Sequence, residues 1–421
     1  METTSDRPAS FAPSAHRDPL FGVNSEFNLG MLPHDLDIDR QVKGIDVLSD
    51  DKILIAASLA RHLIGHIGLI RLEANGNLDA TFADQGLALG SVAGSYDCGA
   101  GKVAFQAPGL IIMLGWMRRI ADGPRILVIT RFNDQGSIDR GFGNEGHVVI
   151  DPSHLGMLDD DSGNVHLLPH GKVLVSANYK NGSHSTGLLV RIDSQGNLDR
   201  SFNASGLLEI KHAVFTSTTA NGLRVQADKQ ILVAGGAQPA NANVQGYVAR
   251  YSDAGVLDLT FGGPDVPGFS TMQLGSAAVT FNTLLAAAED KVIGVGQISG
   301  DKDWAVLVGF DSSGGGYPEF NNGSPVLTSF VEELGSGWFD AHIQADGKIV
   351  CAGGPNRLYM VRYDAHGAID RTFGVNGLIE EEEYSLLTQQ VFVRTQTNGR
   401  TILAANTLGL GSGYLFGYIK H

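Results

Sequence analysis

The sequence predicts an all-β protein, a seven-bladed β-propeller of four-stranded blades. A motif ending in phenylalanine recurs about every 60 residues, and an apolar run recurs between its copies. Glycine, with 55 of 421 residues, is about twice as frequent as usual and lies at turns between short apolar runs. A four-stranded unit repeated in this way, with its edges covered by neighbouring units, is typical of a propeller blade.

The first motif runs from an arginine to a phenylalanine, as in Arg191, Gly196, Asp199 and Phe202. The other copies begin at Arg71, Arg131, Arg250, Gly309 and Arg362. We expect the glycine to take a positive φ, the aspartate to accept backbone hydrogen bonds and the phenylalanine to fill the gap between blades. Two acids per copy are too few for a calcium loop, so the motif is predicted to be structural.

The apolar runs define the strands of each repeat. Seven runs follow a turn, at 51–56, 109–114, 171–176, 229–234, 290–295, 347–352 and 399–404. We expect strand A before the turn, strand B after it, strand C ending at the arginine, and strand D passing through the phenylalanine. The seven hairpins and six full motifs indicate that one repeat is divided.

The two ends of the chain supply the divided repeat. Residues 417–421 align with the start of the motif, and 18–24 align with its second half, so an N-terminal strand should join the C-terminal blade. We expect a flexible tail over 1–12 and a single domain over 13–421. The predicted blades are 41–92, 99–152, 162–212, 220–272, 280–328, 339–380, and 390–421 with 13–31.

Composition narrows the possible partners. A formal charge of −15 disfavours nucleic acid, because neutralising phosphates needs clustered Lys and Arg. There is no run of 18 apolar residues and no secretory signal, so we expect no membrane insertion and, by default, a cytoplasmic protein. Signal-less secretion stays open. Cys98 and Cys351 fit neither a metal nor a disulfide pattern, so no cofactor is predicted, although a divalent cation stays possible.

The repeats resemble a known family. Residues 346–353 followed by 362–377 are similar to the bacterial delta-60 repeat, and the resemblance extends from about Asp18 to the end of the chain. It implies a propeller-like repeat domain. It implies no general activity and no catalytic residues. In the fifth copy Gly309 and Tyr317 replace the arginine and the aspartate, so that corner must be fixed differently.

Loops that vary between repeats point to a binding face. The A–B and C–D turns are alike, whereas the B–C and D–A loops differ and should share the opposite face. We expect that face of a monomer to bind a protein, peptide or glycan, with Trp116 and Trp338 available to stack a sugar or base. It should be acidic through Asp35, Asp37, Asp39, Asp97, 159–161, 332–333 and 380–383.

Strand A should lie nearest the axis of the propeller. One position of this strand is apolar in all seven repeats, and the next is mostly polar. The polar position holds Asp46, Ala104, His166, Arg224, Leu285, His342 and Arg394. Because neighbours along a strand point to opposite sides, the polar set is predicted to face the axis. Arginines there can bind a carboxylate or phosphate, whereas too few ligands converge for zinc.

Two functions fit these features. The first is a non-enzymatic binding or scaffold propeller, favoured because established catalytic motifs are missing from the sequence. The alternative is a lyase or hydrolase that acts on a small anionic substrate in the central channel. In that case His166 or His342 would be the general base, and Arg224 or Arg394 would clamp the substrate.

Overall fold

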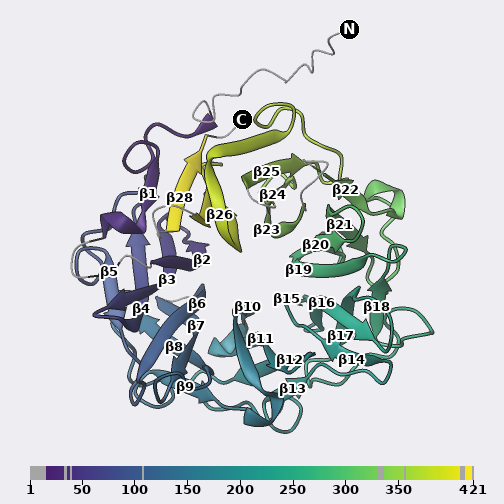
Figure 1. The fold of residues 1–421 in the computed structure, drawn as a ribbon, viewed down its shortest axis with the longest axis horizontal. Coiled ribbons are helices and arrows are strands. Elements are labelled where there is room, and N and C mark those ends of the chain that lie inside the picture. The colour runs from purple at the N-terminus through teal and green to yellow at the C-terminus, as the bar shows by residue number, and fades with distance from the viewer. Residues whose placement is uncertain are drawn as a thin grey trace.

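The computed structural model describes residues 16–32, 36–37, 40–106, 109–329, 336–354, 357–407 and 413–419, without the side chains of 160–162 and 382–389. The predicted tail over 1–12 lies outside these ranges. The fold is the expected seven-bladed β-propeller, with the blades arranged around a central axis (Figure 1). No helix in the described ranges is long and apolar enough to cross a membrane.

Five blades are separate antiparallel sheets. The first has β2 (Gln41–Val47), β3 (Ile53–Arg61), β4 (Ile64–Leu72) and β5 (Leu87–Gly90); the second has β6 (Asp97–Gln106), β7 (Leu110–Arg118), β8 (Ile126–Asn133) and β9 (His147–Ile150). The third has β10 (Met157–Leu167), β11 (Val173–Asn181), β12 (His184–Ile192) and β13 (Leu207–Glu209). The fourth has β14 (Phe215–Thr218), β15 (Gly222–Val225), β16 (Ile231–Pro239), β17 (Gln245–Tyr251) and β18 (Phe269–Met272). The fifth has β19 (Ala278–Ala286), β20 (Val292–Ser299), β21 (Trp304–Phe310) and β22 (Val326–Thr328).

The sixth and seventh blades share one long strand. They contain β23 (Trp338–Ile343), β24 (Ile349–Gly353), β25 (Arg357–Tyr363), β26 (Leu378–Thr395), β27 (Thr401–Thr407), β28 (Gly413–Tyr418) and β1 (Glu26–Asn28). The first part of β26 pairs with β25 and its last part pairs with β27, so the two blades form one seven-stranded sheet. Short 3₁₀ turns occur at η2 (Leu29–Met31), η3 (Ser153–Leu155), η4 (Pro169–Gly171) and η5 (Asn321–Gly323).

The ends of the chain close the ring, as predicted. Strand β1 pairs antiparallel with β28, with Phe27 opposite Leu415. Just before it, Arg17 forms a bridge with Tyr418, and the Asp18 amide donates to the Gly417 carbonyl at 2.8 Å. The seventh blade is therefore built from both termini, and opening the ring requires breaking these contacts.

A buried ion pair reinforces this closure. The Arg17 guanidinium donates to both carboxylate oxygens of Glu381, with Nε at 3.1 Å from Oε1, and the Tyr418 hydroxyl donates to Oε1 at 2.6 Å. The Glu381 side chain is only 1% exposed. We predicted that the acidic run 380–383 would lie on the loop face, and for Glu381 this is wrong because Arg17 and Tyr418 hold its carboxylate inside the protein.

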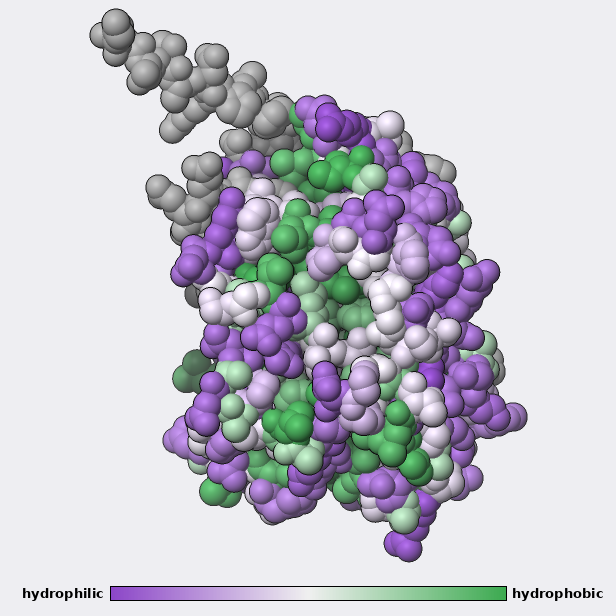
Figure 2. Space-filling view, turned by 90° about the vertical axis from the view of Figure 1, so that its right-hand side faces the viewer, coloured by the Kyte–Doolittle hydropathy of each residue, from purple (hydrophilic) through white to green (hydrophobic). Residues whose placement is uncertain are grey.

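The hydrophobic core lies between the blades. Seven clusters of buried side chains each join two neighbouring blades, and one of them unites the first blade with the seventh. This arrangement is expected for a unit that can bury its apolar faces only against its neighbours. On the outer side of the ring, hydrophobic residues are interspersed among hydrophilic ones (Figure 2).

The repeated motif forms the corner that fixes each blade to the next. Arg191 Nε donates to Asp199 Oδ2 at 2.9 Å, its guanidinium carbon lies 4.8 Å from the centroid of the Phe202 ring, and Nη1 donates to the Asp253 carbonyl of the following blade at 2.5 Å. Gly255 of that blade has φ +80° and lies against the Phe202 ring. The expected roles of the glycine and the phenylalanine are confirmed.

The divergent fifth copy is stabilised by an aromatic contact. Lys291 Nζ lies 4.6 Å from the centroid of the Tyr317 ring, and Tyr317 stacks on Phe320 with their centroids 6.3 Å apart. A cation–π contact thus stands where other copies have an ion pair, such as Lys172 with Asp199 at 2.7 Å.

Strand D begins later than we predicted. After Phe202 the chain turns through Asn203 and Ala204, both at positive φ, and β13 starts only at Leu207. The turn forms because Asp199 Oδ1 accepts the Ser201 amide at 3.0 Å and the Asp199 amide donates to the Arg191 carbonyl at 2.9 Å. The segment that we expected to be a strand is therefore a side-chain-stabilised turn.

Candidate axial binding site

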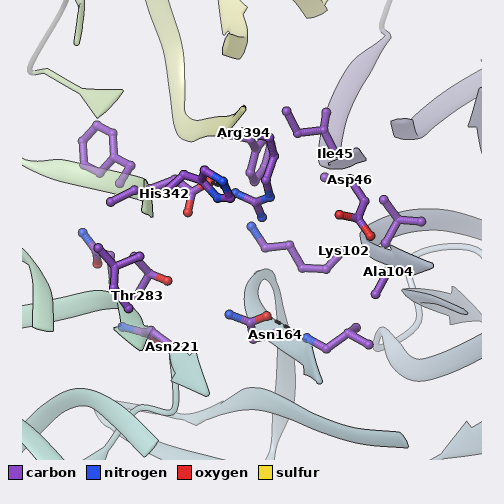
Figure 3. A pocket seen from close by; sticks show the side chains of 18 of the residues that line it. Ile45, Asp46, Lys102, Ala104, Asn164, Asn221, Thr283, His342 and Arg394 are labelled. Carbon is purple, nitrogen blue, oxygen red and sulfur yellow. Dashed lines mark hydrogen bonds and ion pairs between the residues drawn. The ribbon is translucent and has the colours of Figure 1, made fainter. Parts of the chain in front are cut away.

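The inner strands of all seven blades surround a cavity of about 390 Å³ on the axis of the propeller (Figure 3). Asp46, Arg224, His342 and Arg394 of the predicted polar ring line it, together with Ala104 and Leu285. His166 is not among the lining residues, but it lies close enough to Arg224 for that charge to affect its titration. The predicted ring therefore meets at one cavity, apart from His166.

Sequence reasoning missed a second layer of the same wall. Two positions before the predicted ring, Lys102, Asn164, Thr283 and Asp340 also line the cavity. The signal was available, since residues i and i+2 of a strand share one side. We considered only one of the two layers that face the axis.

Irregularities in the inner strands bring further side chains to the wall. The β19–β20 pairing shifts between Phe281 and Thr283, and the β23–β24 pairing shifts between Trp338 and Asp340. At the first shift, Asn282 Nδ2 donates to the Trp338 carbonyl of the next blade at 2.8 Å. Such bulges re-aim side chains, and their positions cannot be read from a strict two-residue alternation.

Both carboxylates of the cavity are already engaged. Asp340 Oδ2 accepts Arg394 Nη1 at 2.7 Å and the Val393 amide at 3.0 Å. Asp46 accepts the amides of Phe105 at 2.9 Å and Val47 at 3.0 Å. Burial raises the pKa of Asp46, whereas the Arg394 charge and these amides act to lower it. Burial opposes the charge of Arg394, but Asp340 and Asp46 outweigh it and raise the pKa of the guanidinium.

Arg224 is in a different position. Its one hydrogen bond to a described residue runs from Nη1 to the Leu223 carbonyl at 3.0 Å, and no described carboxylate lies within ion-pair distance. Burial, and then the charge of Arg394, lower the pKa of Arg224 to about 10. The guanidinium is still charged at neutral pH. The Asp340 charge acts to raise this pKa, but no described carboxylate pairs with Arg224 directly. A half-buried charge without a direct partner is unfavourable, so this site favours an anion.

The two histidines are neutral at physiological pH. Burial, followed by the charge of Arg394, lowers the pKa of His342 to about 4, and burial followed by Arg224 does the same for His166. Neutral imidazoles can donate and accept hydrogen bonds without adding charge. The other ionisable lining residues are Lys102, Arg224 and Arg394, together with Asp46 and Asp340.

The described wall of the cavity is rich in basic residues, although the chain as a whole is acidic. Three basic residues and two carboxylic acids are among the described lining residues, whereas the chain carries −15. Lys102 Nζ lies 4.1 Å from the centroid of the Phe392 ring, which holds it beside the cavity. In Figure 3, Lys102, Arg394 and Asp46 lie on one side, and Asn164, Asn221 and Thr283 lie on the other.

The structure buries most of both tryptophan rings, although Trp116 lines a second cavity of about 260 Å³, so stacking of a ligand on them stays a prediction. Trp338 is fully buried between the fifth and sixth blades, where its ring meets Tyr363 edge-on at 6.4 Å between centroids. Trp116 is 7% exposed, and the Arg125 guanidinium covers its ring at 4.3 Å. Both side chains belong to the hydrophobic clusters between neighbouring blades, where their rings contribute to packing.

The acidic loop face is described only in part. Asp35, Asp39, Glu332 and Glu333 lie outside the described residues, as do the side chains of 160–161 and 382–383. Of the others, Asp37 accepts the Leu63 amide at 2.7 Å, Asp159 pairs with Lys180 at 2.8 Å, and Glu380 pairs with Arg357 at 2.7 Å. Among the residues that the structure describes, no group of three or more His, Cys, Asp or Glu could hold a metal ion.

Comparison with known families agrees with this architecture. The family model "Domain of unknown function (DUF5122) beta-propeller" matches residues 48–82, 168–202, 226–261 and 344–373. Each matched segment contains a corner motif or part of one. The chain is a β-propeller repeat protein. No curated protein sequence matches this propeller significantly.

Solved structures resemble the propeller at low sequence identity. Polysaccharide lyase Uly1 has 8% identity and a TM-score of 0.50, with 90% of each chain covered. The β-propeller domain of the Trilobed protease from Pyrococcus furiosus has 8% identity and a TM-score of 0.45, covering 90% of this chain and 94% of that one. The aldose sugar dehydrogenase from Streptomyces coelicolor has 12% identity and a TM-score of 0.40, covering 86% and 96%. The first of these likenesses supports the fold and says nothing about activity.

Proposed function

We propose that this protein is a non-enzymatic binding propeller whose axial cavity holds a small organic anion. The observation that carries the proposal is the charged Arg224 at the cavity, with no described carboxylate in ion-pair distance. A guanidinium can form two parallel hydrogen bonds with a carboxylate, and such pairs are strong where water is excluded. An anion would pair directly with Arg224, which no described carboxylate does.

Binding fits the cavity better than catalysis. A general base works best when its pKa is near the working pH, and His166 and His342 have pKa values of about 4. The carboxylates that could replace them are held by Arg394 and by backbone amides. A lyase or hydrolase acting at the axis is therefore the weaker proposal, although it would use the same arginines.

The loop face is a second candidate binding surface. Leu63 in the β3–β4 turn is 93% exposed, and Tyr96 and Ile120 in adjoining loops are also exposed on the same face. Exposed apolar side chains on variable loops favour a protein, peptide or glycan partner there. We also propose that the repeats belong to the delta-60 type, which the corner motif supports.

Titration calorimetry at neutral pH tests the axial site. Acetate, succinate, gluconate and inorganic phosphate are the probes, and we expect at least one of them to bind. Arg224→Met should weaken that binding about tenfold or more, because it removes a charge-assisted hydrogen-bonding fork. Arg224→Lys should have a smaller effect, since it keeps the charge and loses the fork.

Arg140→Met is the matched control. Arg140 is an exposed arginine paired with Glu145 at 3.1 Å, so its loss removes a positive charge away from the axis. We expect wild-type affinity from this variant. Failure of every probe to bind, or equal binding by Arg224→Met and the wild type, would refute the anion site.

A further inference from the structure

We propose that the axial ligand is a small hydroxylated monocarboxylate, that is, a sugar acid. This inference rests on the proposed function, because it takes Arg224 as the residue that binds the carboxylate. It adds a chemical class for the rest of the molecule, and that class follows from the neutral part of the cavity wall.

The pairing of the two arginines in the cavity indicates one carboxylate on the ligand. Arg394 is paired with Asp340 at 2.7 Å, whereas no described carboxylate lies within ion-pair distance of Arg224. A single carboxylate therefore gives Arg224 a direct partner. A dicarboxylate or a phosphate dianion would place its second charge in a small cavity that already holds two carboxylates.

The opposite side of the cavity offers neutral hydrogen-bonding groups. Thr283 and Asn164 line the wall, and Asn282 joins them at the bulge of β19. Asn282 uses Nδ2 for the Trp338 carbonyl, and Asn164 uses Oδ1 for the Val165 amide at 2.9 Å. Asn282 Oδ1, Asn164 Nδ2 and the Thr283 hydroxyl make no hydrogen bond to the described residues. His342 adds one donor and one acceptor in its neutral form.

These groups suit hydroxyls better than hydrocarbon. A ligand hydroxyl can both donate and accept, so it can satisfy an amide oxygen, an amide nitrogen and a threonine hydroxyl in turn. An alkyl chain would displace water from the same groups and leave them without partners, which is unfavourable. The volume of about 390 Å³ is near the lower end of ligand cavities, which suits a molecule of sugar size.

Calorimetry with matched probes tests the class of ligand. Gluconate and hexanoate have the same chain length and charge but differ in hydroxyls, whereas glucose has the hydroxyls and no charge. We expect gluconate to bind at least tenfold more tightly than hexanoate or succinate, and glucose to show no measurable binding. Hexanoate binding as tightly as gluconate would overturn the sugar-acid inference.

Two substitutions at one position locate the hydroxyl contacts. Thr283→Val keeps the side-chain shape and removes the hydroxyl, so it should weaken gluconate binding about fivefold and leave hexanoate unchanged. Thr283→Ser keeps the hydroxyl and should stay close to wild type. Far-UV circular dichroism and the melting temperature confirm that the variants are folded. Equal loss of both probes in Thr283→Val would contradict a hydroxyl-specific contact.

The outcomes separate this inference from the proposed function. If carboxylates bind without regard to hydroxyls and Arg224→Met abolishes binding, the anion site stands and the sugar-acid class is wrong. If no probe binds, both fail. If gluconate is preferred and both Arg224→Met and Thr283→Val weaken it, both are supported.

Discussion

The ring closure gives the sharpest stability prediction. Arg17→Met removes the cation that contacts both oxygens of Glu381, a carboxylate only 1% exposed. The Tyr418 hydroxyl, at 2.6 Å, would remain to solvate the carboxylate. Breaking one partner of a buried ion pair costs about 3–5 kcal/mol, because the other charge stays buried without compensation. We expect a loss of that size in the free energy of unfolding.

The position of this pair in the ring increases its importance. Strand β1 contributes three residues to the seventh blade, and the guanidinium of Arg17 also lies 4.4 Å from the centroid of the Phe416 ring on β28. A loss of 3–5 kcal/mol is a large part of the roughly 5–15 kcal/mol that stabilises a typical domain. Weakening this contact should therefore loosen the N-terminal strand before the other blades unfold.

Urea unfolding followed by circular dichroism measures the effect, with proteolysis near the N-terminus as a second readout. Arg140→Met is the control, since the Arg140–Glu145 pair is exposed and should contribute about 1 kcal/mol or less. The double variant Arg17→Met/Glu381→Leu should be more stable than Arg17→Met alone, because it removes the orphaned charge. An Arg17→Met variant as stable as Arg140→Met would refute the reasoning.

Two further predictions concern pH and packing. The pKa values of His166 and His342 are lowered to about 4 in the folded protein, so the unfolded chain, with an ordinary value near 6.5, binds more protons between these limits. The free energy of unfolding should therefore fall as pH falls from about 6.5 to about 4. Replacing both histidines with Gln should reduce this fall by about 1–3 kcal/mol per histidine, measured by urea unfolding at each pH. The raised pKa of Asp46 changes stability with pH in the opposite direction, but it does so equally in the wild type and in the variant, so it drops out of the comparison. An unchanged slope in the variant would contradict the burial of the two imidazoles. Gly255→Ala should cost about 1–3 kcal/mol, because φ is +80° and the new Cβ would lie 2.9 Å from the Phe202 ring; full stability of this variant in thermal unfolding would show that the corner is looser than the structure indicates.

The sequence alone was sufficient for the architecture. The corner contacts join residues close in sequence, such as Arg191 and Asp199, or equivalent turns of adjacent repeats. Interactions of this kind recur at the same motif positions in successive repeats. Comparing the copies within the chain therefore indicates the number of blades, the closure by both ends and the role of each motif residue. The alternation along the inner strands likewise indicated Asp46, Arg224, His342 and Arg394 for the axis.

The tertiary structure decided the features that break this periodicity. Bulges in the inner strands determine where Asn282 and Phe339 lie, and packing between blades encloses Trp116 and Trp338. Glu381 is buried because it meets Arg17 from the opposite end of the chain. Arg224 lacks a carboxylate partner among the described residues because Asp340 is bound to Arg394 on another blade. Each of these outcomes depends on contacts between distant blades, which a repeat pattern does not specify.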